Sequence, residues 1–250
     1  RMFIAISTGG VYRTDDGGKT WAAKNQGVRA EILPDKHPEL GQCVHKIAQN
    51  SKRPGRLYLQ NHWGLYRSDD GGDSWQDMAR GVPSDFGFPI VAHPHDPEVA
   101  YIVPLESDMF RAMPEGKLRV YRTRDGGKSW EPLSKGLPQK DAYETVLRDG
   151  LAADTLDPAG VYFGTRSGRL YGSPNGGVSW TLLADGLPPV VCVKTALVGE
   201  PKRTRGAKKP GAKKPGAKKT TRKATGKRPA GRTKAKARGA SPRGAAKPKK

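Results

Sequence analysis

Four copies of one eight-residue pattern constrain the fold of this chain more than any other feature. The pattern reads [ST]-x-[DN]-G-G-x-[ST]-W, and its copies occupy residues 14–21, 68–75, 123–130 and 173–180. Successive tryptophans are 54, 55 and 50 residues apart, which is the length of one four-stranded β-unit. Because one such unit cannot bury its own apolar face, a repeat of this period predicts a stacked or radial array of units.

Each copy lies between two β-rich runs and reads as a hairpin turn. The glycine pair allows the positive φ angles of a tight turn, and the acidic or amide side chain can accept hydrogen bonds from the turn backbone. The tryptophan opens the next strand and offers a large apolar surface. We therefore assign structural roles, rather than catalysis or calcium binding, to Asp16, Asp70, Asp125 and Asn175 and to Trp21, Trp75, Trp130 and Trp180.

The four copies resemble the Asp-box (BNR) repeat of sialidases, sortilin-type domains and many bacterial proteins named as glycosyl hydrolases. Segments 41–45, 84–89 and 157–164 are similar to one bacterial branch of these repeat proteins. The resemblance covers nearly all of residues 1–199. It implies an all-β fold, a β-propeller of four-stranded Asp-box blades, with the boxes on the blade rims and away from any active site.

Strands are expected in one three-stranded unit and three four-stranded units. Their ranges are 2–7, 11–13 and 20–23; 44–50, 56–61, 64–68 and 74–79; 88–93, 100–105, 119–123 and 129–133; and 145–153, 161–165, 169–173 and 179–184. An extra strand at 190–198 could complete the first unit and close a four-bladed ring. The greater length of the similar proteins, and a start at Arg1 without methionine, favour instead the C-terminal part of a six- to eight-bladed propeller.

Residues 200–250 differ from the rest in composition. From Pro201 onward they hold 21 Lys and Arg with no acidic or aromatic residue, so the remaining 24 basic residues balance the chain's 24 acidic ones. Such a composition cannot form a core and predicts a disordered tail. A tandem repeat at 206–220 resembles the Lys/Ala/Pro tails of linker histones. The basic residues singled out are Lys208, Lys209, Lys213, Lys214, Lys218, Lys219, Arg222 and Lys223.

A flexible polycation attracts nucleic acid through counterion release, which predicts non-specific, salt-sensitive binding by the tail. The tail has no aromatic residue to stack on bases, so no sequence readout is expected. A solubilising role, or contact with acidic proteins or envelope polymers, is the alternative. Two cysteines, Cys43 and Cys192, are expected to be buried and reduced, and no apolar run is long enough to span a membrane. These features favour a cytoplasmic, nucleoid-associated location.

Residues that break the repeat are the candidates for function. The pairs Tyr12-Arg13, Tyr66-Arg67 and Tyr121-Arg122 recur before three boxes and are therefore assigned to structure. Non-repeated polar residues that could face a central channel are His45, His62, Glu106, Asp108, Arg111, Arg148 and Asp149.

Two chemistries are considered at these positions. A sialidase-like glycosidase would need a Tyr–Glu nucleophile pair and further carboxylates, for which Tyr143, Glu144, Glu106, Asp108 and Asp149 are weak candidates. Adjacent strand residues point to opposite faces, which argues against a pairing of Tyr143 with Glu144.

Histidines and cysteines are the second consideration. Cys43, His45, His62, His93 and His95 are metal-ligand types, but their spacings match no closed zinc signature. Structural histidines are favoured, and neither a metal nor a cofactor is predicted.

Together these patterns predict a non-catalytic binding or scaffold propeller with an unknown ligand, tethered to nucleic acid by its tail. The alternative is an exo-glycosidase whose complete active site needs blades outside this chain.

Overall fold

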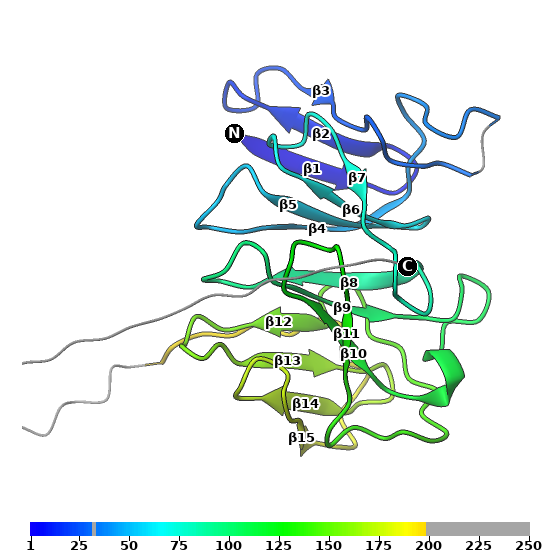
Figure 1. Ribbon diagram of the computed structural model, residues 1–250, viewed down its shortest axis with the longest axis vertical. Helices are drawn as coiled ribbons and strands as arrows, with labels where there is room; N and C mark the ends of the chain where they lie inside the picture. Colours follow the sequence, from blue (N-terminus) through cyan, green and yellow to red (C-terminus); the bar gives the residue numbers. More distant parts are fainter. Residues whose placement is uncertain (32–33, 199–250) are drawn as a thin grey trace, which may run out of the picture. The chain divides into compact units, whose positions relative to one another are not determined.

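The computed structural model describes residues 1–31 and 34–198 (Figure 1). The tail residues from Lys208 to Lys223 that the sequence analysis singled out lie outside the described residues. The first strands are β1 (Met2–Ile6), β2 (Gly10–Thr14), β3 (Ala22–Ala23), β4 (Val44–Gln49), β5 (Leu57–Asn61), β6 (Leu65–Ser68), β7 (Gln76–Asp77) and β8 (Gly87–Ala92). They are followed by β9 (Ala100–Pro104), the 3-10 turn η1 (Pro114–Gly116), β10 (Val120–Thr123), β11 (Glu131–Leu133), β12 (Leu151–Ala153), β13 (Val161–Gly164), β14 (Leu170–Ser173) and β15 (Thr181–Ala184).

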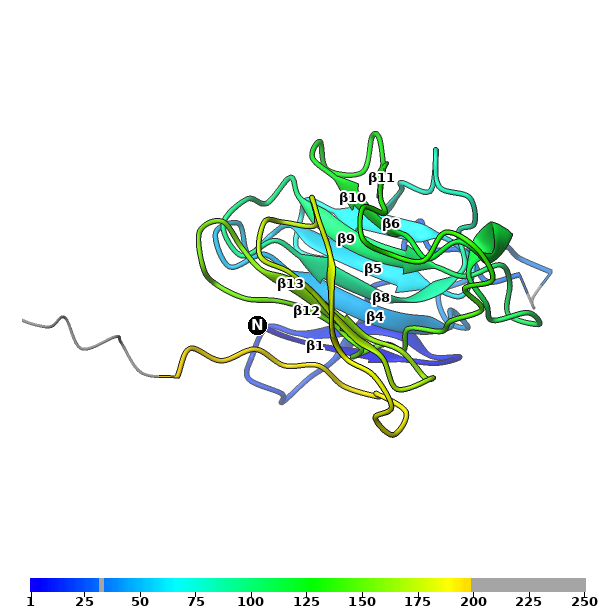
Figure 2. The ribbon, with the colours of Figure 1, turned by 90° about the horizontal axis from the view of Figure 1, so that it is seen from below.

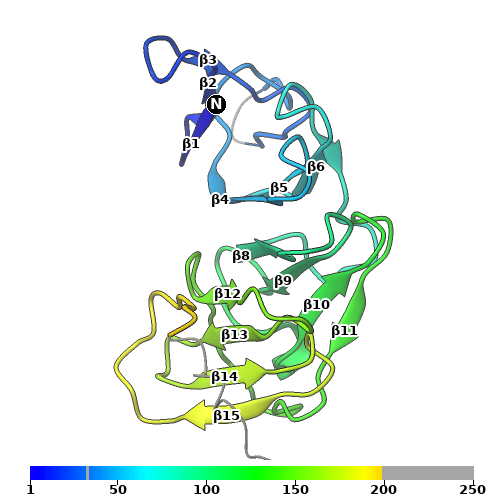
Figure 3. The ribbon, with the colours of Figure 1, turned by 90° about the vertical axis from the view of Figure 1, so that its left-hand side faces the viewer.

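These strands form four antiparallel meanders, which are four blades of a β-propeller. Blade 1 is β1-β2-β3, blade 2 is β4-β5-β6-β7, blade 3 is β8-β9-β10-β11 and blade 4 is β12-β13-β14-β15 (Figure 3). The expected three-stranded first unit and the three four-stranded units are confirmed. Several strands are shorter than expected. The outer strand expected at 74–79 pairs only over Gln76–Asp77, and the one expected at 145–153 begins at Leu151.

The blades pack side by side through their first strands and the strands next to them. β4 contacts β8, and β8 contacts β12. In Figure 2, β1, β4, β8 and β12 gather on one side of the molecule, with β6, β10 and β11 on the other. A hollow of about 310 Å³ follows β4, β8 and β12 and is also lined by residues 193–195. This hollow therefore runs along the first strands of blades 2, 3 and 4.

The segment 190–198 does not form the expected strand on the first blade. It lies instead beside β12 of blade 4, where Cys192 makes an isolated parallel bridge with Asp149 and the Val193 amide donates to the Asp149 carbonyl at 2.7 Å. The segment therefore does not complete the first blade, which was the less favoured of the two placements that the sequence left open. β12 is the edge strand of blade 4, and the segment pairs with the backbone carbonyl of Asp149, just before that strand. Cys192 is also exposed rather than buried, while both cysteines are free thiols.

The Asp-boxes adopt the same hydrogen-bonded turn in every blade. In blade 2, Asp70 Oδ1 accepts from the Ser74 amide at 3.0 Å, and Oδ2 accepts from the Ser74 hydroxyl at 2.6 Å. Ser68 Oγ donates to Asp70 Oδ1 and accepts from the Gly72 amide at 2.8 Å. Gly71 and Gly72 have φ angles of +76° and +89°, which only glycine adopts readily. The structural role predicted for the boxes follows from these bonds.

An arginine on each of the first three blades donates to the next blade's box. Arg13 Nη1 donates to the Gly71 carbonyl at 2.8 Å, and Arg67 Nη1 does the same to Gly126 at 2.5 Å. The third bond joins Arg122 Nη1 to the Gly176 carbonyl at 2.5 Å. The Tyr-Arg pairs therefore have the structural role that their recurrence predicted. Blade 4 carries a glycine, Gly172, at the matching position and has no such arginine.

The box tryptophans fill the interfaces between blades. Trp75 Nε1 donates to the Lys24 carbonyl of blade 1 at 2.9 Å, and Trp130 Nε1 donates to the Met78 carbonyl of blade 2 at 2.8 Å. Trp75, Trp130 and Trp180 are 4, 8 and 4% exposed, whereas Trp21 is 38% exposed. The difference arises because each tryptophan packs on the preceding blade, and no described residue precedes blade 1.

This difference predicts unequal effects of two chemically identical substitutions. Trp75→Ala should lower the free energy of unfolding by about 3–5 kcal/mol, because it opens a cavity between blades 1 and 2. Trp21→Ala, at the exposed position, should lower it by less than about 1 kcal/mol. Urea unfolding followed by circular dichroism measures both values, and equal losses would contradict the interface role of Trp75.

The Asp-boxes also predict acid sensitivity. Partial burial raises the pKa of Asp70, but hydrogen bonds from Ser74 and Ser68 outweigh it and lower the pKa to about 2. The pKa of Asp125 is likewise about 2, for the same balance of causes. A carboxyl whose pKa is depressed in the folded state stabilises the fold above its unfolded pKa of about 3.9, and this contribution is lost as the pH falls towards 2.

The double variant Asp70→Asn/Asp125→Asn should therefore show a shallower fall in unfolding free energy between pH 4 and pH 2. Blade 4 shows that an amide fits the turn, since Asn175 Nδ2 donates to Ser179 Oγ at 3.0 Å. The reciprocal variant, Asn175→Asp, should steepen the fall. Melting temperatures measured across this pH range test both directions, and an unchanged slope in either variant would argue against the assignment.

Candidate ligand-binding site

Non-repeated side chains come together at one end of β4 and β8. Cys43 and His45 lie at the start of β4, and His62 directly follows β5 in the same hairpin. The His62 amide donates to the Cys43 carbonyl at 2.8 Å, so the two residues are neighbours across the hairpin. The ring of His45 lies 5.4 Å from that of His62 and 4.9 Å from that of Phe88 on β8, measured between centroids.

A β-bulge brings His45 into this cluster. Val44 pairs with Asn61 and Lys46 pairs with Gln60, which leaves His45 without a cross-strand partner. A bulge bends its strand and re-aims a side chain, a feature that is over-represented next to functional sites. The sequence alone contains no signal for it.

Burial keeps His45 neutral at physiological pH. Desolvation lowers the pKa of His45 to about 4, and the nearby charges of Arg148 and Arg111 also act to lower it. Its Nδ1 lies 2.6 Å from the Gly87 carbonyl oxygen. Because a carbonyl only accepts, we assign the ring proton to Nδ1, and the lone pair is on Nε2.

Two arginines lie over the Phe88 ring. The guanidinium carbon of Arg111 is 5.4 Å from the ring centroid and that of Arg148 is 5.1 Å, both within cation–π range. The Arg111 Nε donates to the Asp108 carbonyl at 2.9 Å, and both arginine residues are exposed. Within residues 1–31 and 34–198, neither guanidinium lies within ion-pair distance of a carboxylate. Two exposed, uncompensated guanidinium groups on one ring form a site suited to an anion.

Five of the seven predicted channel residues meet in this cluster, and one of them is the carboxylate Asp108. His45, His62, Arg111 and Arg148 surround Phe88 or its neighbour Phe86, and His62 Nε2 lies 3.3 Å from Asp108 Oδ2. The aromatic platform itself was not among the predicted site residues. Both phenylalanines lie in segment 84–89, which the sequence analysis singled out only for its similarity to other repeat proteins.

The remaining predicted residues lie in other environments. Asp149 is ion-paired with Lys46 and lies 3.7 Å from Lys194, and the Lys46 hydrogen bond lowers the pKa of the Asp149 carboxyl. Glu144 is buried and accepts from Arg169 at 2.9 Å and from Ser167 at 2.6 Å.

Two further candidates face solvent. Tyr143 is 65% exposed, whereas its neighbour Glu144 is buried, so the two side chains do not pair although residues 143 and 144 lie outside any strand. Glu106 is exposed, and its backbone carbonyl accepts from Ser84 Oγ at 3.3 Å. Neither side chain contributes a contact to the cluster around Phe88.

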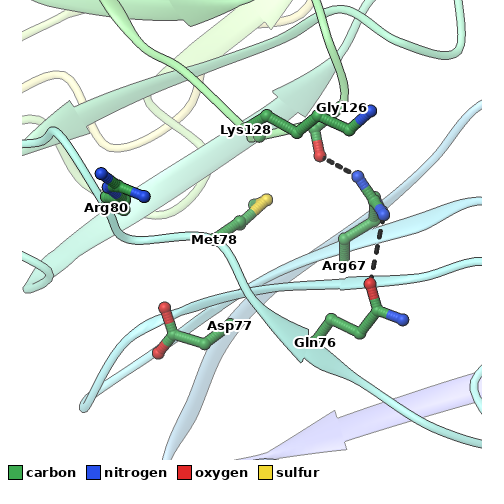
Figure 4. A pocket seen from close by; sticks show the side chains of 8 residues that line it. Arg67, Gln76, Asp77, Met78, Arg80, Gly126 and Lys128 are labelled. Atoms are coloured by element: carbon green, nitrogen blue, oxygen red, sulfur yellow. Dashed lines mark hydrogen bonds between the residues drawn. The ribbon is translucent and has the colours of Figure 1, made fainter.

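A second hollow, of about 340 Å³, lies between blades 2 and 3 (Figure 4). Arg67 crosses it and donates to the Gly126 carbonyl at 2.5 Å and to Gln76 Oε1 at 3.2 Å. The hollow is formed by a box, a Tyr-Arg arginine and an outer strand, all of which recur in other blades. We therefore assign it to the blade interface and place the candidate site at Phe88.

Comparison with known proteins agrees with the repeat and the fold. The family model described as BNR/Asp-box repeat matches residues 12–23, which include the first box. The chain is 25% identical over 158 residues to a vacuolar protein sorting/targeting protein 10 from Verticillium alfalfae, covering 57% of this chain and 9% of that protein.

Solved structures are similar in fold. An ancestral GH74 enzyme has a TM-score of 0.54 and 19% identity, with coverage of 71% of this chain and 22% of that one. A GH74 xyloglucanase from Xanthomonas campestris gives a TM-score of 0.49 and 18% identity, with coverage of 75% and 29%. The chain therefore spans less than a third of the length of the proteins that it matches here.

The antiparallel blades, the four hydrogen-bonded boxes and the match of the repeat model to residues 12–23 define the class: a β-propeller whose blades carry Asp-box (BNR) repeats. Among the described residues, no helix is both long and apolar enough to cross a membrane.

Proposed function

We propose that this chain is a ligand-binding propeller that takes an anionic ligand over Phe88. The observation that carries the proposal is the pair of guanidinium groups, Arg111 and Arg148, that share one ring and have no carboxylate partner in the described structure. Both guanidinium groups keep their positive charge at 5.1 and 5.4 Å from one ring centroid, and a carboxylate or phosphate is the ligand chemistry that pairs with such groups.

A binding role fits the carboxylates better than hydrolysis does. Glycosidases need two carboxyl-type groups about 5 Å apart in retaining enzymes or somewhat further apart in inverting ones, with one able to hold a proton. Glu144 and Asp149 each have a basic partner, and among the described residues Asp108 is the one carboxylate that contacts a side chain of the cluster. The glycosidase alternative would require a second carboxylate from outside the described residues.

Ligand binding is tested by titrating the full chain with sialic acid, glucuronic acid and a sugar phosphate, with glucose as the neutral comparison. We expect the anionic ligands to bind and glucose not to. Arg111→Gln and Arg148→Gln should each weaken binding about tenfold, as the loss of a charge-assisted hydrogen bond worth about 1.5 kcal/mol requires. Arg80→Gln, at an exposed arginine outside the cluster, should leave affinity unchanged. Equal binding of glucose, or hydrolysis of a glycoside of these sugars, would contradict the proposal.

The tail supports a second function, tethering to nucleic acid. Its 21 basic residues without an acidic one favour duplex DNA or RNA through phosphate contacts alone. This proposal rests on composition and is independent of the site at Phe88.

Tethering predicts a steep dependence of duplex affinity on salt. If the tail contacts at least six phosphates, affinity should fall roughly 10³-fold between 50 and 200 mM salt. A full-length variant with Lys208, Lys209, Lys213, Lys214, Lys218 and Lys219 changed to glutamine should bind more weakly and with a smaller salt slope. Fluorescence anisotropy with a labelled duplex measures both, and salt-independent binding would rule the tether out.

A further inference from the structure

We propose that Cys43, His45 and His62 form a zinc-binding site with an open coordination position. One ligand atom from each of the three residues lies within 4.8 Å of the others. Bonds of about 2.3 Å to sulfur and about 2.0–2.1 Å to nitrogen place tetrahedral ligands roughly 3.3–3.7 Å apart. Side-chain movements of about 1 Å therefore bring the three atoms to bonding distance of one ion.

Backbone contacts fix the positions of the three residues relative to one another. The hydrogen bond from the His62 amide to the Cys43 carbonyl fixes the two residues across the hairpin, and the bulge at His45 places its ring beside that of His62. A site built on paired strands is more rigid than one built on loops. The spacing C-x-H with a distant second histidine belongs to no closed zinc signature, which is why the sequence analysis favoured structural histidines.

Two groups around the cluster contact the histidine rings, as the hydrogen-bond partners of metal-bound histidines do. His45 Nδ1 donates to the Gly87 carbonyl at 2.6 Å, which leaves Nε2 as the ligand atom. The Asp108 carboxylate lies 3.3 Å from one ring nitrogen of His62, the carboxylate–histidine arrangement seen at many zinc sites. Both features orient the rings.

The local charge is compatible with a divalent ion. A Cys43 thiolate and the Asp108 carboxylate together balance two positive charges. The guanidinium carbons of Arg111 and Arg148 lie 5.4 and 5.1 Å from the Phe88 ring centroid, and their positive charges oppose the ion through space. One thiolate and two imidazoles are the donor set that zinc and cobalt share, and three protein ligands leave a fourth position for water or another small ligand.

Cobalt is the probe for this site, because a cobalt–thiolate bond has a charge-transfer absorption that free cobalt lacks. The full chain, reduced and freed of metal, should bind one Co²⁺ with this absorption, and Zn²⁺ should displace it. Cys43→Ser should abolish the band, and His62→Ala should lower the affinity at least tenfold. Asp108→Asn, which removes the carboxylate beside the His62 ring, should lower the affinity for cobalt ten- to a hundredfold.

The chain provides matched controls for each ligand. Cys192→Ser removes the other free thiol and should leave the band intact, and His95→Ala should leave the affinity unchanged. Residues 201–250 contain neither cysteine nor histidine, so the tail cannot mimic the signal. Thermal melting of each variant separates loss of a ligand from loss of the fold.

The proposal is overturned if wild-type protein shows no thiolate band at millimolar cobalt, or if the band follows Cys192 instead of Cys43. It does not rest on anion binding. Arg111→Gln/Arg148→Gln should retain the cobalt band, so failure of one proposal can be distinguished from failure of the other.

Discussion

The interface between neighbouring blades is the interaction on which the rest of the structure depends. A four-stranded meander has two faces and cannot bury either alone, so each blade is stable only against the next one. The box tryptophan fills this interface, as Trp75 and Trp130 show, and an arginine such as Arg67 donates across it to a box carbonyl. The same residues turn the chain and join the blades, which explains why the pattern recurs as a unit.

The candidate site depends on the blades but is built from residues that do not repeat. Repeated interfaces fix the relative positions of β4 and β8, and the non-repeated segments at their ends then meet: His45 and His62 from one blade, Phe88 from the next. Arg111 and Arg148 reach the same ring from later parts of the chain. Because the repeated boxes stabilise the blades, the non-repeated site residues can be substituted without loss of the fold.

Much of the fold could be predicted because its determinants are local. Box residues such as Asp70 bond to residues at most four positions away, so spacing alone reveals the turn. The sequence left the placement of segment 190–198 open and did not predict its bridge to Asp149, because that contact joins residues more than 40 positions apart. Cys192, expected to be buried, is exposed for the same reason.

The sequence by itself determined the repeat, the turn chemistry, the order of the blades and the charge imbalance of the tail, since each follows from composition or short-range spacing. Only the tertiary structure decided which polar residues share a site. Cys43, His45 and His62 come together through hairpin pairing and a bulge, and Arg111 and Arg148 each reach the Phe88 ring from a different part of the chain. Contacts between residues far apart in sequence depend on the register and packing of whole sheets, which no local pattern encodes.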